Sequence, residues 1–185
     1  MFRYLGFITV TLSLSTIVIL GFITPNYSHF LDYTSHLGMK DRKYHKFMNT
    51  FGFIIPGVFL ALFSLYLIKE TDLLGKFGAL LLGLSGLFWL LIGVFPFDPK
   101  DVWSVHEKVV DKANLAGVLS ILVFSFYSII NGPVVFGVVS LLVILLLLLR
   151  LYTKFETKVV KKGLVQKIVI LVFFAWLIGL NFVFM

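Results

Sequence analysis

The sequence contains no cysteine, and this absence excludes disulfide bonds, thiolate nucleophiles, CxxC redox chemistry and cysteine metal sites. Charged residues are scarce as well: they make up 14% of the 185 residues, whereas a soluble domain would carry about 25%. The four histidines form neither of the metal-binding patterns HxxxH and HExxH. We also find no internal repeat, no low-complexity tract and no segment with the composition of a soluble domain.

What the sequence has instead is a series of long apolar runs. Hydrophobic residues make up 59% of the chain, and the mean hydropathy is +1.03. A helix needs about 20 largely apolar residues to cross a bilayer. Six segments meet this requirement: 4–24, 50–68, 77–95, 113–130, 134–152 and 165–184. We therefore predict an all-α fold in which residues 1–185 form a single transmembrane domain, a polytopic bundle of six helices with short loops.

The basic residues predict how this bundle is oriented. Thirteen of the sixteen Lys and Arg residues lie in or beside the first, third and fifth loops, and only Arg3, Lys69 and Lys76 lie on the other side. Because cytoplasmic loops carry an excess of Lys and Arg, we expect these three loops in the cytoplasm and both termini outside the cell membrane. The loops also account for the net charge of +7, so we expect no nucleic-acid partner.

Ionisable side chains are missing from the middle of every predicted span. Such residues usually mark proton relays and ion pathways, so the sequence disfavours an ion-coupled transporter. All four histidines and seven of the nine acidic residues belong to the predicted cytoplasmic side. Any chemistry is therefore expected at that face.

Three residues on this face are candidates for catalysis: Ser35, Asp98 and His106. Imidazole and carboxylate groups are suitable Zn²⁺ ligands, and the candidate metal ligands are His36, His45, Asp98 and His106. We expect no cofactor, and Zn²⁺ is the alternative.

The position of His106 depends on where the fourth span begins. A helix that starts near Val102 places His106, Val110 and Asn114 on one face at i, i+4 and i+8, whereas a start at Ala113 leaves His106 in a loop. The sequence does not decide between the two.

The first loop contains a basic cluster that consists of Lys40, Arg42, Lys43 and Lys46. Each such residue near a membrane contributes about 1 kcal/mol toward binding anionic headgroups, so we predict that the cluster contacts lipid. Asn49 or Thr50 is expected to be the N-cap of the second span, because short polar side chains favour that position.

Several short motifs resemble the domain of unknown function 998 family of small six-helix membrane proteins, which is distantly similar to the DRAM/Sfk-type membrane proteins. The motif residues are Ser35, Leu37, Gly38, Asn49, Gly57, Phe95, Pro96, Asp98 and His106, and we add Asn114. The chain departs from the family pattern at His36, where we expect an acidic residue. The resemblance implies six helices over nearly the whole chain and brings no established reaction with it.

Three functions stay open from the sequence. The first is a multi-pass structural, accessory or lipid-interacting membrane subunit, with membrane lipids and a homo-oligomer or a membrane complex as partners. The second is an interfacial metal-dependent lipid hydrolase that uses the His and Asp candidates of the cytoplasmic side. The third is a translocator of small solutes or lipids. The sequence favours a protein that is not an enzyme, and it assigns no reaction.

Overall fold

The computed structural model of the chain describes residues 2–100, 105–155 and 162–185. Within these ranges, the side chains of residues 149–155 and 162 are not described. All secondary structure in these residues is helical. The elements are the 3₁₀ turn η1 (Phe2–Tyr4), α1 (Leu5–Ile23), the 3₁₀ helix η2 (Thr34–Gly38), α2 (His45–Phe47), the π-helical segment η3 (Met48–Ile54), α3 (Ile55–Glu70), α4 (Leu73–Val94), α5 (Val105–Asn131), α6 (Val134–Phe155) and α7 (Lys162–Val183).

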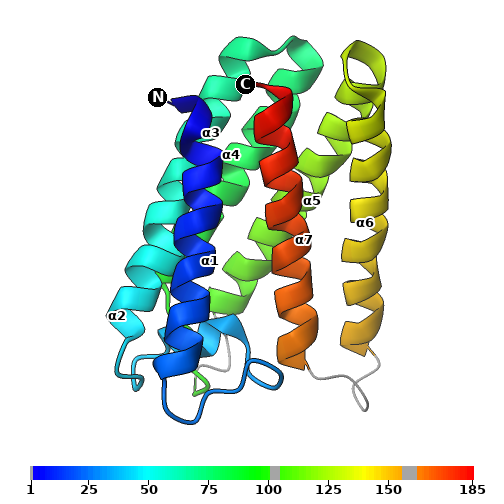
Figure 1. Cartoon of the computed structure of the whole chain (residues 1–185). Helices are drawn as coiled ribbons and strands as arrows, with labels where there is room; N and C mark the ends of the chain where they lie inside the picture. The colour runs from blue at the N-terminus through cyan, green and yellow to red at the C-terminus, as the bar shows by residue number, and fades with distance from the viewer. Residues whose placement is uncertain (1, 101–104, 156–161) are drawn as a thin grey trace.

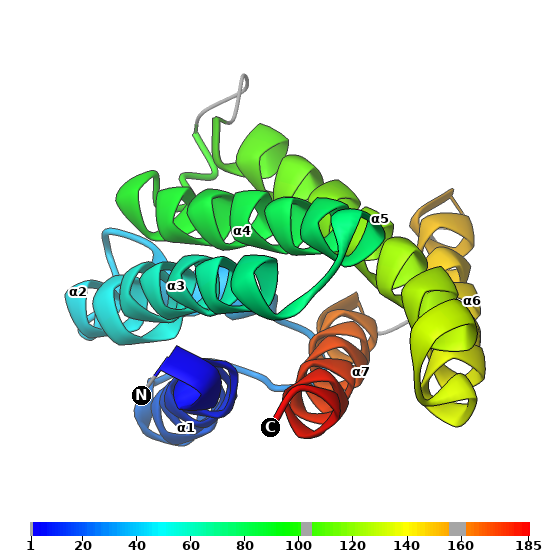
Figure 2. The ribbon, with the colours of Figure 1, turned by 90° about the horizontal axis from the view of Figure 1, so that it is seen from above.

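The long helices form a bundle in which both chain termini lie at the same end (Figure 1). Seen along the bundle, α3 and α4 run side by side, α5 follows α4, and α1 and α7 cover the opposite side (Figure 2). The segment between α1 and α2 lies at the end away from the termini, together with η2 (Figure 1). We call this the loop end of the bundle.

The predicted spans match these helices closely. Five described helices are long and apolar enough to cross a membrane, and α6 is apolar from Val134 to Leu148. The chain is therefore a membrane-embedded helical bundle. The second span begins earlier than predicted, because α2 and η3 run continuously into α3 from His45. Within the described residues α5 starts at Val105 and carries His106 in its first turn, so the fourth span does not begin at Ala113.

Small residues let the central helices approach closely. A Cβ atom on Gly57 of α3 would lie 2.5 Å from the backbone nitrogen of Leu90 and 2.6 Å from the carbonyl oxygen of Gly86, both in α4. Between α4 and α5, the Ser85 hydroxyl donates to the Ala113 carbonyl at 2.9 Å. Close backbone contact of this kind is how helices pack in lipid, where the hydrophobic effect does not drive them together.

The π-helical segment precedes Pro56, which has no backbone N–H. The carbonyl of Gly52, four residues earlier, therefore lacks its usual α-helical donor. The Ser13 hydroxyl of α1 donates to it at 2.9 Å, and the indole N–H of Trp89 in α4 lies at 3.3 Å. Side chains of neighbouring helices thus satisfy a polar group that lipid could not.

The prediction that Asn49 or Thr50 caps the second span is wrong. Both residues lie inside η3, after the helix has begun at His45. Asn49 is buried, and its amide donates instead to the Gly38 carbonyl at 3.0 Å. A Cβ atom on Gly38 would collide with the Asn49 side chain. The two motif residues therefore form one contact, which fixes the end of η2 against η3.

Candidate functional site

A cavity of about 380 Å³ lies between α4, α5, α6, α7 and η2. Most of its wall is apolar, including Trp89, Val118, Leu147, Val169 and Phe173. Trp89 and Phe173 have nearly parallel rings with centroids 6.1 Å apart. The cavity therefore has a largely apolar lining inside a membrane-embedded bundle.

Polar side chains line the part of the cavity near the loop end. They are Thr34, Ser35, His106, Asp111, Asn114 and Gln166. These residues come from η2, from the first turns of α5 and from the start of α7. The cavity is thus amphipathic, with an apolar body and a polar end.

His106 is the most buried ionisable residue of this polar end, with 5% of its surface exposed. Its Nδ1 atom lies 2.8 Å from the Phe95 carbonyl oxygen, just after α4. Because a carbonyl only accepts, Nδ1 carries the proton, and the neutral ring keeps Nε2 as an acceptor. Nε2 is buried and has no hydrogen-bond partner in the described part of the chain. The His106 ring also packs against the Phe97 ring in a T-shaped arrangement, with centroids 5.7 Å apart.

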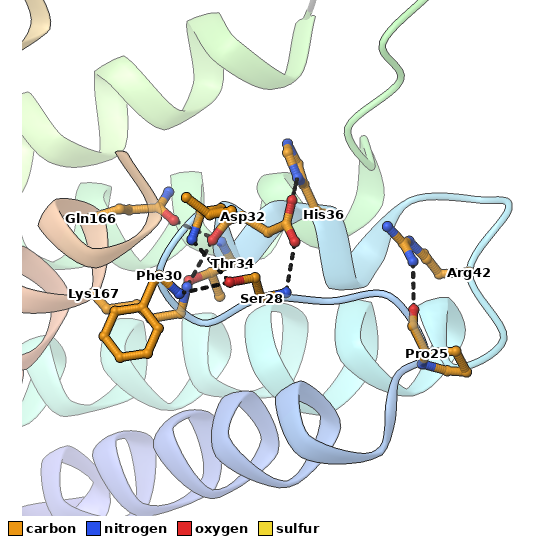
Figure 3. Close-up of polar contacts among 10 residues, drawn as sticks. Pro25, Ser28, Phe30, Asp32, Thr34, His36, Arg42, Gln166 and Lys167 are labelled. Atoms are coloured by element: carbon orange, nitrogen blue, oxygen red, sulfur yellow. Dashed lines mark hydrogen bonds and ion pairs between the residues drawn. The ribbon is translucent and has the colours of Figure 1, made fainter. Parts of the chain in front are cut away.

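The Phe97 ring also stacks on His36, with centroids 5.3 Å apart. The Nδ1 atom of His36 donates to the Asp32 carboxylate at 3.3 Å, and the backbone N–H of Ser28 donates to the other carboxylate oxygen at 2.7 Å (Figure 3). Asp32 therefore organises the turn that leads into η2. The Phe97 ring thus contacts both His36 of η2 and His106 of α5.

Three contacts hold the first loop to the start of α7, and those made by Gln166 and Lys167 can be followed in Figure 3. The Thr34 backbone N–H donates to the Gln166 side-chain oxygen at 2.7 Å, and the Lys167 ammonium donates to the Asp32 carbonyl at 2.8 Å. The Leu164 N–H donates to the Phe30 carbonyl at 3.0 Å. We call these three bonds the latch. They place η2 across the polar end of the cavity.

Burial and nearby charges shift the pKa values of three groups in the first loop. Burial alone would raise the pKa of Asp32, but the Ser28 N–H and His36 outweigh it and hold this pKa below its usual 3.8. Burial, reinforced by the positive charge of Lys167, lowers the pKa of His29 from its usual 6.5. Burial and then the charge of Asp32 raise the pKa of Tyr27 well above 10. The loop thus favours an ionised Asp32 and an uncharged His29.

The structure brings some of the candidate residues together and separates others. Ser35, His106 and Asn114 all line the cavity, whereas Asp98 accepts a hydrogen bond from the Lys100 N–H at 2.9 Å. Among the described residues we see no hydrogen bond between Asp98 and His106.

The metal candidates likewise have separate partners. His45 lies 2.8 Å from the Arg42 carbonyl, and His36 binds Asp32. Across residues 2–100, 105–155 and 162–185, no three His, Cys, Asp or Glu side chains gather in a way that could hold a metal ion. The zinc alternative stays a prediction.

The predicted basic cluster lies at the loop end: Lys40, Arg42 and Lys43 belong to the first loop and Lys46 to α2, and the three lysines are exposed. The Arg42 guanidinium donates to the Pro25 carbonyl at 2.9 Å and so ties two parts of the loop together (Figure 3). The exposed apolar side chains of Leu31 and Phe47 belong to the same loop end. This combination of cations and exposed apolar groups is typical of a membrane interface.

Sequence reasoning missed Asp32, Thr34, Phe97 and Gln166. The contacts of Thr34 and Asp32 with α7 join residues more than 130 positions apart, and a single sequence carries no signal for such pairs. Gln166 offered one local hint, because it is a carboxamide at the edge of an apolar run.

Comparison with known proteins gives one result that covers most of the chain. No curated protein and no solved structure matches it. Residues 7–183 match the family described as protein of unknown function, DUF998. The match includes the cavity, η2 and the latch, and it agrees with the resemblance carried by the short motifs. The chain therefore belongs to the DUF998 family.

Proposed function

We propose that this protein binds a membrane lipid in the cavity between α4, α5, α6 and α7. The observation that carries the proposal is the amphipathic lining. The wall around Trp89 and Phe173 is apolar, and the polar groups gather at the end near η2. A volume of about 380 Å³ lies within the range of about 300–1,000 Å³ that is typical of small-molecule sites. In a membrane, the molecule with this distribution of polarity is a lipid.

The charge pattern supports an orientation for this lipid. Under the positive-inside rule, the loop end faces the cytoplasm and both termini face outward. The polar end of the cavity then lies at the cytoplasmic headgroup level, and the acyl chain lies along the apolar wall. The exposed cations Lys40, Lys43 and Lys46 would contact anionic headgroups beside the cavity. The proposal thus combines an internal lipid site with a surface that holds the protein at the same leaflet.

Occlusion of the cavity tests the lipid site. We would replace Val118 and Val169, which both line the cavity, with Phe, and quantify by mass spectrometry the lipid that the purified protein retains. The control replaces Val138 and Val139 with Phe, because both are 48% exposed on α6 and lie outside the lining. We expect the occluded variant to lose most retained lipid while the control keeps it. Equal retention by both variants would refute the proposal.

The orientation can be tested independently because the chain has no cysteine. A single Lys43→Cys variant places a thiol at the loop end, and Gly132→Cys places one in the α5–α6 connection at the other end (Figure 1). In intact cells, a membrane-impermeant maleimide should label the Gly132→Cys variant and leave the Lys43→Cys variant unlabelled until the cells are permeabilised. The reverse pattern would overturn the orientation.

A further inference from the structure

Two polar atoms at the polar end of the cavity lack partners. The Thr34 hydroxyl and the His106 Nε2 atom are both buried, and neither has a hydrogen-bond partner among the described residues. The two side chains are almost fully covered, with 1% and 5% of their surfaces exposed. Both residues line the cavity. Buried polar groups are nearly always paired, so two unpaired groups beside one cavity point to a ligand that supplies the partners.

The chemistry of these two atoms restricts that ligand. The Nδ1–H of His106 already donates to the Phe95 carbonyl, so Nε2 of the neutral ring can only accept. The backbone N–H of Thr34 is occupied by Gln166, whereas its hydroxyl can donate and accept. The pair therefore requires at least one donor, and a hydroxyl group on the ligand meets both demands.

The charge of the lining points to an uncharged headgroup. The charged side chain of the described lining is Asp111, which is exposed and already takes part in another interaction. The described lining contains no Lys or Arg, and a buried phosphate or carboxylate would need such a partner to offset its desolvation. The exposed cations of the first loop lie outside this lining. Anionic lipids therefore suit the loop surface, whereas the cavity suits a neutral lipid.

We propose that the cavity takes a lipid with an uncharged hydroxyl headgroup, such as a glycerol monoester, which donates to His106 Nε2 and pairs with the Thr34 hydroxyl. This inference rests on the proposed lipid site and names the class of lipid that it holds. Solvent does not reach either atom in this conformation. A headgroup therefore reaches them when the neighbouring lining side chains change rotamer, and the apolar chain lies against Trp89 and Phe173.

The test compares two probes that share one acyl chain. Monoolein carries free hydroxyl groups, and methyl oleate carries none. We would measure the retention of each by native mass spectrometry in the wild-type protein and in Thr34→Val, which removes the hydroxyl and preserves the shape. The matched control is Thr16→Val, because the Thr16 hydroxyl bonds to Leu12 within its own helix and lies outside the cavity.

We expect the wild type and Thr16→Val to prefer monoolein by about tenfold, which corresponds to about 1.4 kcal/mol. Thr34→Val should bring the two probes close to parity by weakening monoolein alone. Equal binding of both probes by the wild type, or an unchanged preference in Thr34→Val, would overturn the headgroup assignment. If the double Phe variant of Val118 and Val169 still lowers the retention of both probes, the lipid site itself stands. If that variant retains both probes like the wild type, the lipid site fails and this inference fails with it.

Discussion

Gln166 is the residue through which α7 holds η2, and its replacement should open the latch locally. The variant Gln166→Leu keeps the size of the side chain and removes the oxygen that accepts the Thr34 N–H at 2.7 Å. A buried donor left without an acceptor costs about 1–3 kcal/mol. This corresponds to a rise of about 5- to 150-fold in the population of the open loop. Hydrogen exchange of the peptide around Thr34, measured in detergent micelles, should accelerate by that factor.

The control for this experiment is Gln166→Glu, which keeps an oxygen in place and should keep the exchange slow. The other two latch bonds, to Phe30 and Asp32, persist in both variants, so peptides from α3 and α4 should exchange at the wild-type rate. Unchanged exchange around Thr34 in Gln166→Leu would refute the claim that this bond holds η2. A uniform acceleration across the bundle would mean that Gln166 acts on global stability instead.

Three further predictions follow from the packing, the titratable groups and the metal question. Gly57→Ala should lower the free energy of unfolding in SDS titration by about 1–3 kcal/mol, because its Cβ meets backbone atoms of α4, whereas Gly132→Ala, with open space around it, should leave it unchanged. Because the pKa of His29 is lowered in the folded loop, the unfolded loop binds the proton first, so thermal stability should fall as the pH drops below 6.5. A His29→Phe variant should show a weaker dependence. Elemental analysis of the purified wild type and of His106→Ala should find no bound zinc. Stoichiometric zinc in the wild type that the variant lacks would instead support the hydrolase hypothesis.

The helical architecture could be predicted because hydropathy is a property of each segment alone. Each of the six predicted runs overlaps one long helix. The predicted ends were less accurate where polar residues extend a helix beyond the hydrocarbon. The second helix starts at His45, and the described part of α5 starts at Val105. Both extensions carry His and Lys residues, which a search for apolar runs leaves out.

The candidate site was predictable only in part, because its geometry depends on contacts between distant segments. The i, i+4, i+8 spacing placed His106 and Asn114 on one helix face, and the structure puts both in the cavity lining. The partnership of Asn49 with Gly38 replaced the predicted N-cap, because the π-helical segment turns Asn49 inward. Neither the π-helix nor the pairing of Thr34 with Gln166 has a local sequence signal.

Two rings that line this cavity, Trp89 and His106, also pair backbone carbonyls that lie near prolines. Pro56 leaves the Gly52 carbonyl without an α-helical donor, and the indole of Trp89 reaches it at 3.3 Å. Pro96 follows the end of α4, where the last carbonyls have no intrahelical donor, and His106 donates to the Phe95 carbonyl at 2.8 Å. Trp89 and His106 each donate a ring N–H to a backbone carbonyl, and both residues line the cavity. The need to pair backbone groups in lipid therefore helps to hold the Trp89 indole and the His106 imidazole beside the cavity.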